Sequence, residues 1–137
     1  MIKTTTVALV ALLLATGSGA RATEPSCADS PARVAACFTV HGRLTYSTGI
    51  PNYRIWIVGT KRILGVHGAA GHPWEENQLP DAVARWMSEG DGDGPPHSRA
   101  AFGDFVVCPL APDEPKVMRR VCVASASKLA FRKDFDW

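Results

Sequence analysis

The chain has 137 residues, of which 46% are hydrophobic and 20% are charged. Its 15 basic residues exceed its 13 acidic residues by only two, too few for the broad positive surface that nucleic-acid-binding proteins carry. A chain of this length forms a single domain around one hydrophobic core.

The first 22 residues have the pattern of a secretory signal peptide. Lys3 provides a positive n-region, residues 7–15 form an apolar h-region, and residues 20–22 (ARA) give a cleavage site. The apolar run is shorter than the roughly 20 residues that a transmembrane helix needs. The sequence therefore predicts a periplasmic or secreted protein with no transmembrane segment after cleavage. Cleavage removes Lys3 and Arg21 but no acid, so 13 basic and 13 acidic residues remain.

All four cysteines follow the predicted signal: Cys27, Cys37, Cys108 and Cys122. An even number of cysteines in an exported chain predicts two disulfide bonds, and the absence of a C-x-x-C pair argues against a zinc or redox motif. We prefer the pairing that joins Cys108 to Cys122 across a terminal hairpin and Cys27 to Cys37 in the N-terminal arm, each closing a short loop. The alternative joins Cys37 to Cys108 and Cys27 to Cys122.

After an N-terminal arm (residues 23–36), residues 37–128 are predicted to form one β-rich domain. Residues 37–47 (CFTVHGRLTYS) alternate between apolar and polar side chains, which predicts a half-buried strand. Gly42 falls at an inward position, where a glycine often marks a bulge or a sharp bend. Residues 129–137 are predicted to form a tail or an extra strand.

Residues 54–66 (RIWIVGTKRILGV) predict a β-hairpin. With Gly59 and Thr60 as a two-residue type II′ turn, Trp56 pairs with Ile63 and Ile55 pairs with Leu64. Both faces of this hairpin are apolar away from the tip, so we expect both to be covered, with Trp56 and Ile63 packed.

Residues 79–89 (LPDAVARWMSE) have apolar side chains at helical spacing and predict the single helix of the domain. Residues 102–110 and 116–126 predict two further strands around a proline-rich turn. The resulting order of three strands, a helix and two strands is that of a five-stranded OB-like barrel. A small β-sandwich with a helical insertion is the alternative.

Five side chains form the candidate ligand-binding surface. His41 and Arg43 lie on the outward face of the first strand, and Arg54, Lys61 and Arg62 lie in the hairpin. Guanidinium and ammonium groups bind carboxylates and phosphates, which favours an anionic ligand. Charges at the tip of a hairpin also keep it soluble and deter edge pairing, which is the competing interpretation of Lys61 and Arg62.

Catalytic chemistry has little support in the sequence. There is no G-x-S-x-G motif, and no catalytic residue or cofactor is predicted. His67, His72 and Glu75 offer weak candidate metal ligands in one loop, but their spacing fits no established metal motif.

Four blocks of sequence occur in order: FTVHGRL, RIWIVGTKRILGV, FGDFVVCPL and RRVCVASA. Together they resemble a family of small secreted or periplasmic proteins of unknown function from Gram-negative bacteria, over residues 37–66 and 102–126. The resemblance implies an exported β-rich domain and assigns no functional residue.

The sequence therefore predicts an exported, non-enzymatic binding or structural module of the bacterial envelope. Its expected partner is an unidentified envelope component or protein, and not a nucleic acid. The alternative is a small metal-dependent hydrolase that uses His67, His72 and Glu75.

Overall fold

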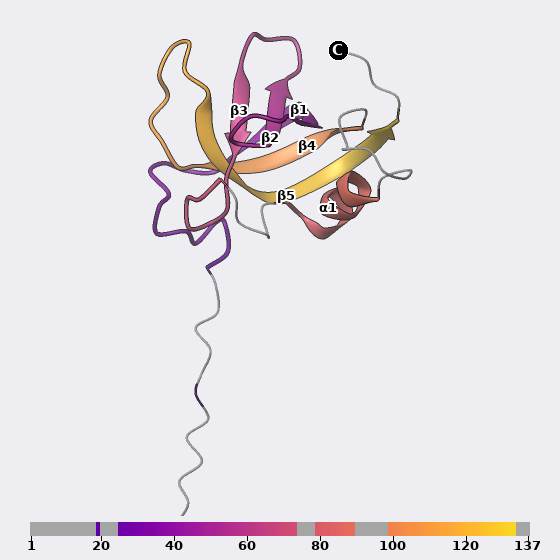
Figure 1. Ribbon diagram of the computed structural model, residues 1–137. Helices are drawn as coiled ribbons and strands as arrows, with labels where there is room; N and C mark the ends of the chain where they lie inside the picture. Colours follow the sequence, from indigo (N-terminus) through magenta and orange to yellow (C-terminus); the bar gives the residue numbers. More distant parts are fainter. Residues whose placement is uncertain (1–18, 20–24, 74–78, 90–98, 134–137) are drawn as a thin grey trace, which may run out of the picture.

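The computed structural model describes residues 19, 25–73, 79–89 and 99–133 (Figure 1). The predicted signal peptide, except Gly19, and Glu75 lie outside the described residues. The described part contains strands β1 (Phe38–Tyr46), β2 (Tyr53–Ile57) and β3 (Ile63–Val66), helix α1 (Asp81–Ser88), and strands β4 (Ala100–Pro109) and β5 (Arg119–Arg132). None of the helices in these segments has the length and apolar character that crossing a membrane requires.

The five strands close into a barrel in the order β1-β2-β3-β5-β4. β1 pairs antiparallel with β2 and with β4, β4 pairs antiparallel with β5, and β3 pairs parallel with β5. The parallel pair requires a long connection between β3 and the last hairpin, and α1 lies in that connection (Figure 1). The predicted OB-like barrel is therefore confirmed, and a two-sheet sandwich is excluded because the hydrogen-bonded ladder is continuous.

The barrel interior holds one apolar core that α1 completes. Fully buried side chains include Leu44, Ile55 and Phe105 from the strands, and Val83 and Met87 from the helix. The helix was predicted over residues 79–89 and is observed over Asp81–Ser88, with Asp81 in its first turn.

The β2–β3 hairpin has the predicted register, with Trp56 opposite Ile63 and Ile55 opposite Leu64. The predicted type II′ turn is wrong. Thr60 N donates to Ile57 O at 3.1 Å, which places Gly59, with φ of +81°, at the third position of a β-turn. Glycine at that position fits a type II turn, and the connection is longer than two residues.

The expectation that both faces of this hairpin are covered is also wrong. Ile55 and Leu64 are buried in the barrel, but Ile63 is 43% exposed and Trp56 is only partly buried. On the outer face, Pro51 and Met118 pack over Gly65 of β3, whereas Ile63 stays largely open to solvent, so this face is covered only in part.

Gly42 is explained by close packing and not by a bulge in β1. It pairs with Ile57 on one side and with Gly103 on the other without a register shift. A Cβ atom at position 42 would lie 2.4 Å from Ile55 Cγ2, so only glycine fits between the strands. The register shifts of the barrel lie in the β4–β5 ladder instead.

The last strand is longer than predicted. β5 runs from Arg119 to Arg132, so residues 129–132 of the predicted tail or extra strand belong to β5, and residues 134–137 lie outside the described residues. Ala130 and Phe131 continue the ladder opposite Phe102 and Ala101 at the start of β4. The Phe131 ring also stacks on Trp86 of α1 with centroids 4.9 Å apart, which links the end of the strand to the helix.

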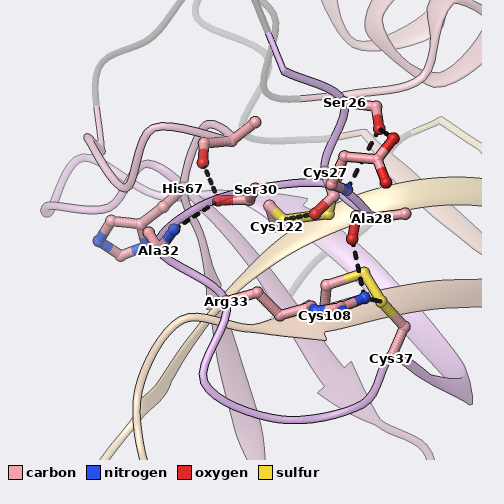
Figure 2. Close-up of a disulfide and its surroundings, with 12 residues drawn as sticks. Ser26, Cys27, Ala28, Ser30, Ala32, Arg33, Cys37, His67, Cys108 and Cys122 are labelled. Carbon is pink, nitrogen blue, oxygen red and sulfur yellow. Dashed lines mark hydrogen bonds between the residues drawn. A yellow bond between two sulfur atoms is a disulfide. The ribbon is translucent and has the colours of Figure 1, made fainter.

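The preferred disulfide pairing is wrong, and the alternative pairing is observed. Cys27 is bonded to Cys122 and Cys37 to Cys108, with sequence separations of 95 and 71 residues. Figure 2 shows the N-terminal arm crossing the barrel beside both bonds. The arm is anchored there because Val34 N donates to Pro109 O at 2.9 Å.

The physical reason for this pairing is the path of the arm. Cys108 and Cys122 are opposite each other in the β4–β5 hairpin, as the predicted disulfide between them assumed. The arm instead brings Cys27 and Cys37 to the same end of the barrel, where the sulfur atoms join Leu110 in a second buried apolar cluster.

Candidate functional site

The outer face of β1 and β2 carries a cavity of about 410 Å³. We name it the arginine groove; its lining residues are Arg43, Thr45, Ser47, Arg54, Trp56 and Ile63. Side chains alternate along a strand, so Arg43 and Thr45 of β1 point outward, as do Arg54 and Trp56 of β2. Their register places Arg43 opposite Trp56 and Thr45 opposite Arg54, which brings the two arginines onto neighbouring strands.

Arg43 and Trp56 contact each other in the arginine groove. The Arg43 guanidinium carbon lies 4.8 Å from the centroid of the Trp56 ring, in a cation–π arrangement. Trp56 is held in place because its Nε1 donates to Thr60 O at 2.7 Å. Burial lowers the pKa of Arg43 from its ordinary value, which is high enough that the group stays cationic at neutral pH.

Arg54 is positioned by the loop between β1 and β2. Its Nε donates to Pro51 O at 3.3 Å. The loop is closed by Ser47 N, which donates to Asn52 O at 2.6 Å, and by Asn52 Nδ2, which donates to the Tyr46 hydroxyl at 3.0 Å. The Arg54 guanidinium is therefore directed across the outer face by a hydrogen-bonded turn.

Tyr53 supports the same loop from inside. Its ring meets Tyr46 edge-on, with centroids 5.6 Å apart, and both rings pack against the core. Burial, followed by the neighbouring Tyr46, raises the pKa of Tyr53 above its ordinary value. This aromatic pair fixes the end of the barrel from which Arg54 emerges.

A second cavity of about 310 Å³ lies next to the arginine groove. We name it the lysine cavity; it is lined by Lys61, Arg62, Ile63, Lys116, Val117 and Met118. Its walls come from the β2–β3 loop and the β4–β5 loop. Arg62 ties these loops together, because Nη1 donates to Glu114 O at 3.2 Å and Nη2 forms an ion pair with Asp113.

The structure thus separates the five predicted ligand-binding residues. Arg43 and Arg54 share the arginine groove, Lys61 lines the lysine cavity, and Arg62 bridges its walls. His41 lines neither cavity. Its Nδ1 lies 2.9 Å from Asp104 Oδ1 on β4, and Lys128 Nζ lies 3.5 Å from the other Asp104 oxygen.

The neighbouring His41 and Lys128 side chains change the pKa of Asp104. The hydrogen bond with His41 lowers the pKa of Asp104 below its ordinary value, burial opposes this effect, and the Lys128 ammonium lowers the pKa further. A histidine and a carboxylate in contact suit proton transfer, but no hydroxyl or thiol nucleophile completes the pair among the described hydrogen bonds.

Two of the three weak metal candidates, His67 and His72, lie in the described part of the chain, and Glu75 lies outside it. His67 is buried and its Nδ1 donates to Gly65 O at 3.1 Å, while His72 is exposed. Within the described segments, the one group of three possible metal ligands is Cys27, Cys108 and Cys122, which lie within 4.8 Å of one another. All three sulfurs are in disulfide bonds and are not available as thiolate ligands.

The sequence interpretation missed several lining residues, among them Trp56, Ile63 and Lys116. Trp56 and Arg54 are two residues apart in a strand, so their shared face was readable from the alternation. Lys116 lies in the β4–β5 loop, where no periodic signal exists, and only the closure of the barrel places it near Lys61.

No family model matches this sequence, and no curated protein or solved structure is significantly similar to it. The resemblance of the four strand blocks to a family of secreted proteins therefore stays a prediction.

Proposed function

We propose that this chain is an exported, non-enzymatic module of the bacterial envelope that binds an anionic component in the arginine groove. The observation that carries the proposal is the convergence of Arg43 and Arg54 from adjacent strands onto one open cavity beside Trp56. Export is supported by the signal-peptide pattern and by the two disulfide bonds, which are typical of oxidising compartments.

The chemistry of the arginine groove favours an anion. A guanidinium presents a planar fork of N–H donors that matches a carboxylate or a phosphate. No acidic residue of the described segments lines the groove, while the hydroxyls of Thr45 and Ser47 add polar partners. The apolar surface of Trp56 and Ile63 favours a ligand that also carries apolar groups.

Binding without catalysis is supported by what lines the two cavities. Among the described residues, neither cavity is lined by a histidine, a cysteine or a carboxylate, the side chains that most often serve as a general base. No geometry of the described residues favours the alternative of a metal-dependent hydrolase. Stoichiometric zinc in the purified, untagged protein would contradict the non-enzymatic proposal.

The test is binding of the purified protein to three anionic envelope materials: lipopolysaccharide, phosphatidylglycerol vesicles and acidic polysaccharide. We expect at least one to bind, and we expect the Arg43→Ala/Arg54→Ala variant to lose about tenfold or more in affinity, since each lost charge-assisted contact contributes about 1.5–3 kcal/mol. Arg85→Ala is the matched control, because Arg85 is exposed on α1 and lines neither cavity. Binding to none of the three, or equal loss in the control, would contradict the proposal.

A further inference from the structure

We propose that the ligand is a linear acidic oligosaccharide, a chain of sugar rings with repeated negative charges, that occupies the arginine groove and the lysine cavity together. This inference rests on the proposed function, because it extends the ligand of the arginine groove along the barrel. It assigns the lysine cavity as a second subsite.

The two cavities are adjacent. Ile63 lines both of them, so a ligand in one cavity is in reach of the other. Pockets for small molecules have volumes of roughly 300–1,000 Å³. The volume of each cavity is near the lower end of this range. A ligand made of repeated units therefore fits this surface better than one compact anion.

Positive charge is present along the whole surface. Arg43 and Arg54 lie in the arginine groove, and Lys61 and Lys116 lie in the lysine cavity. Among the described residues, no salt bridge joins either lysine to an acid. The nearby Asp113 carboxylate is paired with Arg62, which reduces its repulsion of an anionic ligand.

Apolar side chains lie between these cations. Trp56 and Ile63 line the arginine groove, and Val117, which is 52% exposed, and Met118 line the lysine cavity. Sugar rings present C–H faces as well as hydroxyl and carboxylate groups, so this alternation of apolar and cationic side chains complements them. A cluster of lysines without apolar neighbours would not select for rings.

The observations favour a saccharide over other polyanions. Single-stranded nucleic acids are bound by successive stacking aromatics, but Trp56 is the one aromatic side chain among the described residues that line the two cavities, and Arg43 covers one of its faces. An acidic peptide that adds a strand binds along a strand edge, whereas the cations of the two cavities lie on the outer face of β1 and β2 and in loops. The separate cavities also suit a chain better than a flat lipid surface.

The experiment measures the dissociation constants of oligogalacturonates and oligomannuronates from one to six units by titration calorimetry. For the wild-type protein we expect affinity to rise about tenfold or more between one and six units, because additional units engage the second subsite. The Lys61→Ala/Lys116→Ala variant should bind the single unit as the wild type does but lose most of this gain. The Arg43→Ala/Arg54→Ala variant should weaken at every length, and Arg85→Ala should match the wild type.

Three results would overturn the inference. The first is affinity that is independent of length, or a gain that the double lysine variant retains. The second is an equal or larger gain with hexaglutamate or with an oligothymidylate of the same charge. The third is no binding of either saccharide series by a protein that binds another anionic envelope material in the arginine groove. In that case the proposed function stands and the assigned ligand class does not.

Discussion

Arg43 and Trp56 are register partners on β1 and β2, and the guanidinium of one lies 4.8 Å from the ring centroid of the other. This contact holds a cation on the outer face of the barrel. It links the fold to the proposed function, because the same register that closes the barrel also builds the arginine groove.

Replacing Arg43 by Ala removes the cation–π contact. We expect Arg43→Ala to lower the free energy of unfolding by about 0.5–1 kcal/mol, the value of such contacts at partly exposed sites. Urea unfolding followed by circular dichroism measures the change. The exposed Arg85→Ala control should stay within about 0.5 kcal/mol of the wild type, and an equal loss in both variants would contradict a specific role of the Arg43–Trp56 contact.

The disulfide bonds connect the N-terminal arm to the end of the barrel. Removing the bond that closes 95 residues, with Cys27→Ser/Cys122→Ser, should lower the free energy of unfolding by about 2–5 kcal/mol. Urea unfolding measures this loss, and peptide mapping of the unreduced wild type should find Cys27 linked to Cys122 and Cys37 to Cys108. A peptide that links Cys108 to Cys122 would contradict the observed topology.

Gly42 is buried where two strands approach closely. Gly42→Ala would place a Cβ atom 2.4 Å from Ile55 Cγ2 and 3.4 Å from Phe105 Cδ2, so we expect a loss of about 1–3 kcal/mol from overpacking. Thermal and urea unfolding measure it. Gly49→Ala is the matched control, because its added Cβ would meet the movable end of Arg54, 2.6 Å away, and should cost less. Equal losses at the two positions would show that core packing is not the cause.

Asp104 makes the stability depend on acid pH. Its pKa is lowered in the folded protein, chiefly by the hydrogen bond with His41, so the ionised carboxylate favours folding. This contribution is present above the ordinary carboxyl pKa of about 4 and is lost as the pH falls through the lowered value. Urea unfolding from about pH 5 to about pH 2 should show a smaller loss for Asp104→Asn and for His41→Ala than for the wild type. Identical acid dependence in all three proteins would refute this role.

Export is testable independently of binding. Expression of the full-length chain with its own signal in a Gram-negative host should give a periplasmic or secreted protein whose intact mass corresponds to residues 23–137. Thiol titration of the denatured, unreduced protein should find no free cysteine, since all four are paired. An uncut cytoplasmic protein with reactive thiols would contradict the predicted location.

Local sequence patterns determined much of this fold. The alternation in residues 37–47, the hairpin register of Ile55 with Leu64, and the helical spacing of Val83 and Met87 all reappear in the structure. These features depend on near neighbours in the chain, because strand and helix periods decide which side chains share a face. The order of the elements was sufficient to predict an OB-like barrel.

Only the tertiary structure decided the features that depend on distant segments. The arm reaches the end of the barrel, so Cys27 pairs with Cys122 and not with Cys37. Closure of the barrel leaves the outer face of Trp56 and Ile63 open and brings Lys116 beside Lys61. The sequence by itself identified Arg43 and Arg54 as candidate anion-binding residues. Strand register and long-range packing place these two arginines in one groove with Trp56, and they pair His41 with Asp104. The period of a single strand or helix does not encode such contacts.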